Sequence, residues 1–132
     1  MPKHTPFDTS EHHIYVACHL VDWHGLTHAF RAIVDTGAPV TEFSDEFLAA
    51  IGLVKIDDTK EIKVTAFEQT KRYAKLVLPK IEYLGQVMVN TSVKVSRFAE
   101  GWGVDALIGL DFFRMFRVTV DYMAGQIVTE SY

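Results

Sequence analysis

Apolar side chains recur at every second position along most of this chain of 132 residues. Ile14, Val16, Cys18 and Leu20 would share one face of a strand, and the segment from Val87 to Val95 repeats the pattern. Alternation with a period of two is typical of strands that bury one face, whereas helices repeat every 3.6 residues. The pattern therefore predicts a mostly β protein rather than one built from βαβ units.

Two short helices are expected among the strands. Ser44 can cap a helix over residues 44–51, and Asp111 can cap another that runs to Met115. We predict a closed or folded-over β-barrel with two short helices, formed by residues 13–132 as a single domain that follows a loose N-terminal arm, residues 1–12. The other strands are expected at residues 30–34, 62–66, 73–78, 80–84, 106–109, 118–122 and 126–129.

Composition excludes several classes of function. Hydrophobic residues make up 48% of the chain and the net charge is −4, as in an ordinary globular protein rather than a disordered one. Thirteen basic against seventeen acidic residues argue against nucleic-acid binding through a broad basic surface. No apolar run is long enough to span a membrane, and the polar N-terminus favours a cytoplasmic protein. The six histidines and single cysteine show no metal-ligand spacing, so we expect no metal and no cofactor.

The sharpest motif is Asp35-Thr36-Gly37, which follows the apolar strand ending at Val34. An aspartate in this place can be exposed at a strand end, with backbone N–H groups to hold its carboxylate. Gly37 allows the chain to turn sharply or to approach another segment closely. The same tripeptide is also ordinary turn chemistry, because Asp and Gly both favour turns. The motif alone therefore does not distinguish a catalytic site from a turn.

A second motif, Ala106-Leu-Ile-Gly-Leu-Asp-Phe-Phe113, makes the catalytic interpretation stronger. Two apolar residues precede a glycine, and an expected helix follows. Together with the later Phe-Arg-Val-Thr-Val-Asp-Tyr segment, this order resembles the retropepsin-like aspartic proteases, and bacterial-type members most. The resemblance covers roughly residues 13–130 and implies the single-domain acid-protease barrel of that family.

The resemblance also implies roles for individual residues. Asp35 matches the catalytic aspartate, and Thr36 matches the residue whose hydroxyl braces the two active-site loops across a two-fold axis. Gly37 lines the substrate groove with backbone groups, and Ala38 supports the same loop. The substrate groove would also include Leu107, Ile108 and Gly109. Asp111 fits a helix cap better than a second catalytic acid.

The central hairpin from Ile62 to Leu78 matches the flap that closes over a bound peptide in this family. Its tip has no glycine, unlike many members. Phe67 and Tyr73 would contact substrate from the flap, although both are equally suited to cross-strand packing. Glu42 would face solvent or line a pocket that prefers basic side chains.

The family's reaction needs two carboxylates that share one proton, and this chain carries one Asp-Thr-Gly. The resemblance therefore implies a homodimer in which each chain supplies one Asp35. We expect an aspartic endopeptidase, a hydrolase acting on peptide or protein substrates. The alternative is a catalytically silent protein of the same fold that serves for dimerisation or peptide binding.

Overall fold

The computed structural model describes residues 1–56, 62–64, 69–71 and 74–132. Most of its regular structure is strand, and both helices are short, as predicted. The elements in chain order are β1 Lys3–Pro6, β2 Tyr15–Val21, β3 Thr27–Val34, β4 Glu42–Ser44, α1 Asp45–Ala50, β5 Val54–Ile56, β6 Ile62–Val64, β7 Gln69–Lys71, β8 Ala74–Tyr83, β9 Gln86–Ser96, β10 Ala106–Ile108, α2 Leu110–Phe113, β11 Arg117–Asp121 and β12 Gln126–Glu130.

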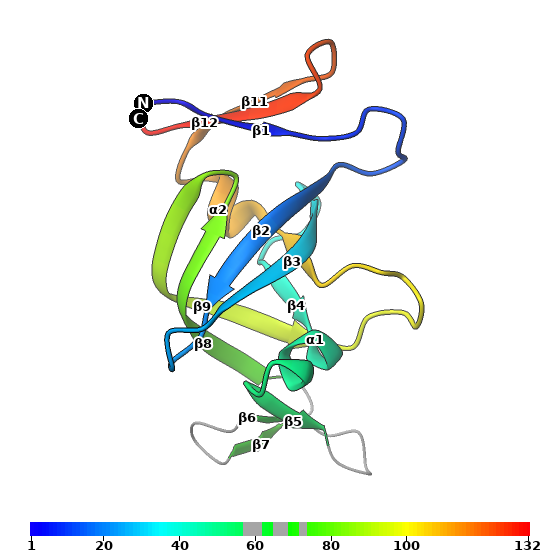
Figure 1. Ribbon diagram of the computed structural model, residues 1–132, viewed down its shortest axis with the longest axis vertical. Coiled ribbons are helices and arrows are strands. Elements are labelled where there is room, and N and C mark those ends of the chain that lie inside the picture. The colour runs from blue at the N-terminus through cyan, green and yellow to red at the C-terminus, as the bar shows by residue number, and fades with distance from the viewer. Residues whose placement is uncertain (57–61, 65–68, 72–73) are drawn as a thin grey trace.

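Six strands close into a barrel in the order β10-β3-β2-β8-β9-β4 (Figure 1). Their inward side chains form one hydrophobic core, to which Val16, Cys18 and Leu20 contribute from β2 as the alternation predicts. Most neighbouring strands are antiparallel, but β10 lies parallel to β3, and β4 lies parallel to β9. The predicted closed barrel is therefore confirmed, and its parallel pairs bring together segments far apart in the sequence.

Residues 74–83 form one continuous strand, although the sequence predicts two strands that meet near Pro79. Pro79 has no N–H to donate, and Asn90 on β9, which stands opposite in the register, has a positive φ of 49°. At this point the buried positions change parity, from Leu76 and Leu78 to Ile81 and Tyr83. Pro79 and Asn90 thus form a corner where the hairpin bends around the barrel without breaking.

The N-terminal segment is not a loose arm as predicted, because Lys3–Pro6 pairs antiparallel with Gln126–Thr129. With β11 these strands make a three-stranded sheet, β1-β12-β11, which carries both chain termini at one end of the molecule (Figure 1). The arm lacks strong alternation, and only the exposed edge of β12 supplies its partner. The predicted final hairpin of β11 and β12 is confirmed.

A second small sheet, β5-β6-β7, lies at the opposite end of the molecule (Figure 1). Ile62–Val64 pairs with Gln69–Lys71, and the strand beginning at Ala74 pairs with β9 instead. The predicted hairpin from 62 to 78 is therefore wrong in its pairing, since its second strand is β7. Phe67 and Tyr73, expected to contact substrate, lie outside the described residues.

The two helices begin differently. Ser44 caps α1 as predicted, its hydroxyl accepting from the backbone N–H of Phe47 at 3.3 Å. The prediction that Asp111 caps α2 is wrong. Gly109, which has no side chain, occupies the cap position, and Asp111 lies in the first turn. In α1 the side chain of Asp45 is fully buried, and its carboxylate forms an ion pair with Arg97 at 2.6 Å.

Candidate active site

Asp35 stands directly after β3, where the strand leaves the barrel. Its backbone N–H donates to the Ile108 carbonyl at 2.9 Å, which extends the parallel pairing of Val34 with Ile108 by one step. Parallel neighbours need a long connection. The segment from 35 to 105 provides it, so that β10 runs in the same direction as β3. The backbone N–H of Asp35 is therefore fixed by β10.

The Asp35 carboxylate is held by its own loop, residues 35–41 between β3 and β4, which is called the Asp35 loop. Its Oδ1 atom accepts from the Gly37 N–H at 3.0 Å, and the Ala38 N–H donates to the Asp35 carbonyl at 3.1 Å. A Cβ at position 37 would lie 3.2 Å from that carboxylate oxygen, so glycine keeps this approach open. Because Asp35 is half-exposed, its carboxylate is oriented by the loop and reaches solvent.

Gly109 allows the turn between β10 and α2 to press against this loop. A Cβ at Gly109 would lie 2.6 Å from the carbonyl carbon and oxygen of Val40, closer than any real side chain could approach. Across the same contact, the Leu110 N–H donates to the Ala38 carbonyl at 2.8 Å. The glycine of the second motif thus serves backbone packing beneath the Asp35 loop.

Thr41 and Asp111 join the two motifs through side chains. The Thr41 hydroxyl donates to Asp111 Oδ1 at 2.7 Å, and the Thr41 N–H donates to the same carboxylate at 3.0 Å. The Gly109 N–H completes the group by donating to Thr41 Oγ1 at 3.1 Å. Nothing in the sequence around either residue predicts this link, because the two partners lie seventy positions apart.

The remaining predicted residues occupy different depths. Thr36 is exposed beside a cavity of about 350 Å³ that His12, His13, Val120 and Tyr122 also line. Leu107 is half-buried, whereas the side chain of Ile108 is fully buried in the barrel core. The structure thus places Thr36 and Leu107 at the surface and Ile108 beneath it.

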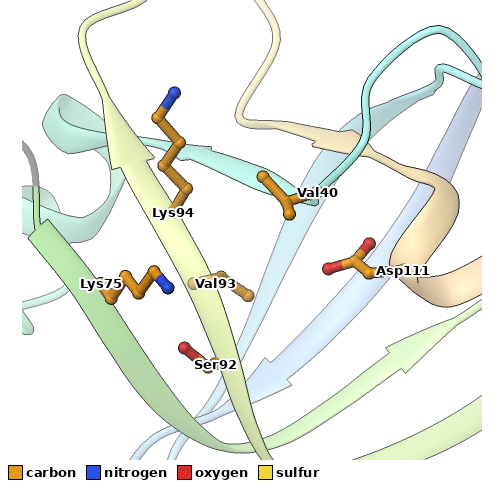
Figure 2. Close-up of a pocket in the computed structure, with 6 residues that line it drawn as sticks. All are labelled: Val40, Lys75, Ser92, Val93, Lys94 and Asp111. Carbon is orange, nitrogen blue, oxygen red and sulfur yellow. The ribbon is translucent and has the colours of Figure 1, made fainter.

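A second cavity, of about 230 Å³, is lined by Val40 near the end of the Asp35 loop (Figure 2). Its walls come from β8, β9, the loop and α2, and Asp111 points into it from α2. The residues that line it are Val40, Lys75, Ser92, Val93, Lys94 and Asp111. This cavity is not predictable from the sequence, because its walls come from four separate segments.

Glu42, expected to face solvent or to line a pocket for basic groups, is half-buried on β4 and pairs with Lys94 at 3.4 Å. Elsewhere in the described part of the chain, no three His, Cys, Asp or Glu side chains gather to hold a metal ion. No helix among the described residues is long and apolar enough to cross a membrane.

This fold is found in other solved structures. A retropepsin-like aspartic protease from Rickettsia conorii matches with a TM-score of 0.61 and 18% identity, over 98% of this chain and 90% of that one. The retroviral protease-like domain of Ddi1 from Leishmania major matches with a TM-score of 0.50 and 17% identity, over 83% and 81%. At such low identity these likenesses concern the fold, and the closed barrel is of the retropepsin-like aspartic-protease class.

The sequence itself places the chain in a family. Residues 25–115 match the family described as "gag-polyprotein putative aspartyl protease", a span that contains both Asp35-Thr36-Gly37 and Leu107-Ile108-Gly109. The chain therefore belongs to this aspartic-protease family, which confirms the resemblance seen in its motifs. Among curated protein sequences, no match is found.

Proposed function

We propose that the protein is an aspartic endopeptidase that hydrolyses peptide bonds as a homodimer. The observation that carries this proposal is the half-exposed Asp35 carboxylate, which the Gly37 N–H orients at 3.0 Å. Among the described residues its Oδ2 atom accepts no hydrogen bond, so this oxygen is available to water and substrate. A carboxylate that is fixed on one side and open on the other suits general base work.

Two such carboxylates, one from each chain, would share a proton. Like charges at close range cannot both ionise, so the ionised member would activate water while the protonated member polarises the scissile carbonyl. The titration then belongs to the pair rather than to either Asp35. This reaction forms no covalent intermediate and uses neither metal nor cofactor.

The exposed Thr36 supports a two-fold contact beside Asp35. Its hydroxyl would meet the other chain across the axis, with the same patch on both subunits. The polar lining of the neighbouring cavity, including His12 and His13, would lie at the edge of that contact.

A peptide would bind as an added strand along the Asp35 loop. Gly37 and Leu107 would contact it, because both reach the surface. Ala38, Ile108 and Gly109 would act from below by holding the loop, since all three are buried. Contacts from Phe67 and Tyr73 remain part of this proposal, as does a location in the cytoplasm.

The test combines peptide cleavage with sedimentation. Wild-type protein should cleave members of a random peptide library, and a statine-containing peptide should inhibit it, because statine resembles the tetrahedral intermediate. Asp35→Asn should sediment like the wild type and cleave nothing. Glu100→Gln, on an exposed loop away from both motifs, should keep cleavage.

Each failure has a distinct meaning. Cleavage that survives Asp35→Asn would remove Asp35 from the mechanism. A protein that binds peptides, ignores the statine group and cleaves nothing would be the silent peptide-binding alternative. A protein that stays monomeric while cleaving would overturn the two-carboxylate scheme.

A further inference from the structure

The cavity beyond Val40 (Figure 2) lies beside the proposed peptide track and carries its own chemistry. Val40 comes five residues after Asp35 and is exposed, so the loop that orients the carboxylate also forms one wall of this cavity. An extended peptide advances about 3.3 Å per residue. A peptide laid along the loop would therefore bring a side chain to the cavity a few residues away from the cleaved bond.

The strand register leads from the groove to the same place. Leu107 on β10 stands opposite Glu42 on β4, Glu42 stands opposite Lys94 on β9, and Lys94 stands opposite Lys75 on β8. Residues that face one another across neighbouring strands share a face of the sheet. These four residues form one row across the sheet. The row begins at the apolar Leu107 in the proposed substrate groove and ends at the charged lysines that line the cavity.

The two lysines of this row have different surroundings. Lys94 pairs with Glu42 at 3.4 Å, and its ammonium group points away from Lys75 (Figure 2). Lys75 is exposed, and within the described part of the chain no carboxylate forms an ion pair with it. Lys75 is therefore the cation whose charge is available at the cavity.

Asp111 supplies the opposite charge from the far wall. Its Oδ1 atom accepts from the Thr41 hydroxyl and from the Phe112 N–H, at 2.7 and 2.9 Å. Its Oδ2 atom accepts only the shared Thr41 N–H, at 3.1 Å, among the described residues. A carboxylate oxygen has two acceptor positions, so Oδ2 can take a further donor from the cavity.

From this arrangement we infer that the cavity is a specificity pocket for a side-chain carboxamide, glutamine or asparagine, on the substrate peptide. The inference rests on the proposed function. The amide oxygen would accept from the Lys75 ammonium, and the amide NH₂ would donate to Asp111 Oδ2. A glutamate would be repelled by Asp111 and a lysine by Lys75, while a leucine would leave both groups without a partner.

The experiment measures binding, so it does not depend on cleavage. A random library of acetylated, amidated dodecapeptides is passed over immobilised Asp35→Asn protein, and the retained peptides are sequenced by mass spectrometry. Retained peptides should favour Gln over Glu and Lys by about tenfold at one position. Lys75→Glu places two carboxylates at the cavity and should change that preference to Lys.

Lys80 provides the matched control, since it is an exposed lysine on the same strand, β8, beyond the corner at Pro79. Lys80→Glu makes the same charge change and should leave the Gln preference intact. Thermal unfolding of both variants should match that of the parent protein, which would show that they fold.

The outcomes separate the two proposals. Gln preference without cleavage by the wild type would support the pocket and refute the peptidase. Cleavage by the wild type, with no Gln preference or with equal effects of Lys75→Glu and Lys80→Glu, would refute the pocket alone. A preference for Glu or for Lys in the parent protein would show that one charge dominates, and it too would overturn the carboxamide assignment. Failure to retain any peptide would overturn the pocket as well.

Discussion

The Thr41 hydroxyl lies 2.7 Å from Asp111 Oδ1, which ties the end of the Asp35 loop to the first turn of α2. Thr41 is almost fully buried, and its oxygen also accepts the Gly109 N–H. The Thr41 side chain thus donates to the Asp111 carboxylate and accepts from the Gly109 backbone N–H. In a site built from two distant motifs, this threonine holds both in place.

Removing that hydroxyl should destabilise the protein. Thr41→Val keeps the shape of the side chain but removes the hydroxyl that accepts from the Gly109 N–H and donates to Asp111. We expect the free energy of unfolding to fall by about 3 kcal/mol. Urea denaturation measures this cost. Thr91→Val is the control, because the Thr91 hydroxyl makes one long bond of 3.3 Å to the Val89 carbonyl, and it should change stability by less than about 0.5 kcal/mol. Equal effects of the two variants would contradict the role given to Thr41.

The two motif glycines should respond differently to alanine. Gly109→Ala puts a methyl group 2.6 Å from backbone atoms of Val40, so we expect a loss of about 3 kcal/mol or failure to fold. Gly37→Ala meets only the Asp35 carboxylate, at 3.2 Å. It should keep the circular dichroism spectrum and the unfolding midpoint while lowering peptide cleavage. Normal stability of Gly109→Ala would show that the contact with Val40 is not close.

Acid should weaken the turn between β2 and β3. Asp22 is bonded to His28 Nε2 at 2.8 Å and to the backbone N–H groups of Leu26 and His24, and these bonds hold the pKa of its carboxyl below the ordinary 3.8. A depressed pKa in the folded state means that the stabilisation is complete above the unfolded pKa and is lost as the pH falls through the folded one.

Asp22→Asn should therefore be less stable than the wild type at pH 7, and the difference should shrink below about pH 4. Unfolding by urea across this pH range measures it. Glu100→Gln, on an exposed loop, should show no comparable trend. A difference that stays constant down to pH 2 would mean that the ionised carboxylate is not what Asp22 contributes.

Cys18 should be inert in the folded protein. It is 1% exposed, and burial raises the pKa of its thiol to about 12, so almost no thiolate exists at neutral pH. Iodoacetamide at pH 8 should leave the native protein unlabelled while it modifies glutathione in the same tube. In urea the cysteine should react fully, as mass spectrometry would show. Rapid labelling without denaturant would indicate that β2 opens often.

Much of the fold was predictable because its signals are local. Alternation placed the inward face of β2 at Val16, Cys18 and Leu20, and Ser44 indicated the start of α1. The Asp35-Thr36-Gly37 motif indicated a candidate site only together with the second motif, Leu107-Ile108-Gly109, because the tripeptide alone is also ordinary turn chemistry. These features depend on neighbours in the sequence, so no tertiary information was needed to find them.

Other features depend on pairings between distant segments. Residues 3–6 form a strand only because β12 offers an edge, and β8 continues through Pro79 because Asn90 bends with it. Thr41 meets Asp111, and Lys75 meets the cavity, only once the barrel has closed.

Most of the barrel strands, the residue that carries the candidate carboxylate and the family resemblance could be read from the sequence. The contacts that hold that carboxylate, and the cavity beside it, appear only in the folded chain. Alternation sets which face of a strand is buried, whereas the register between strands sets which side chains meet, and this register depends on the whole closed barrel.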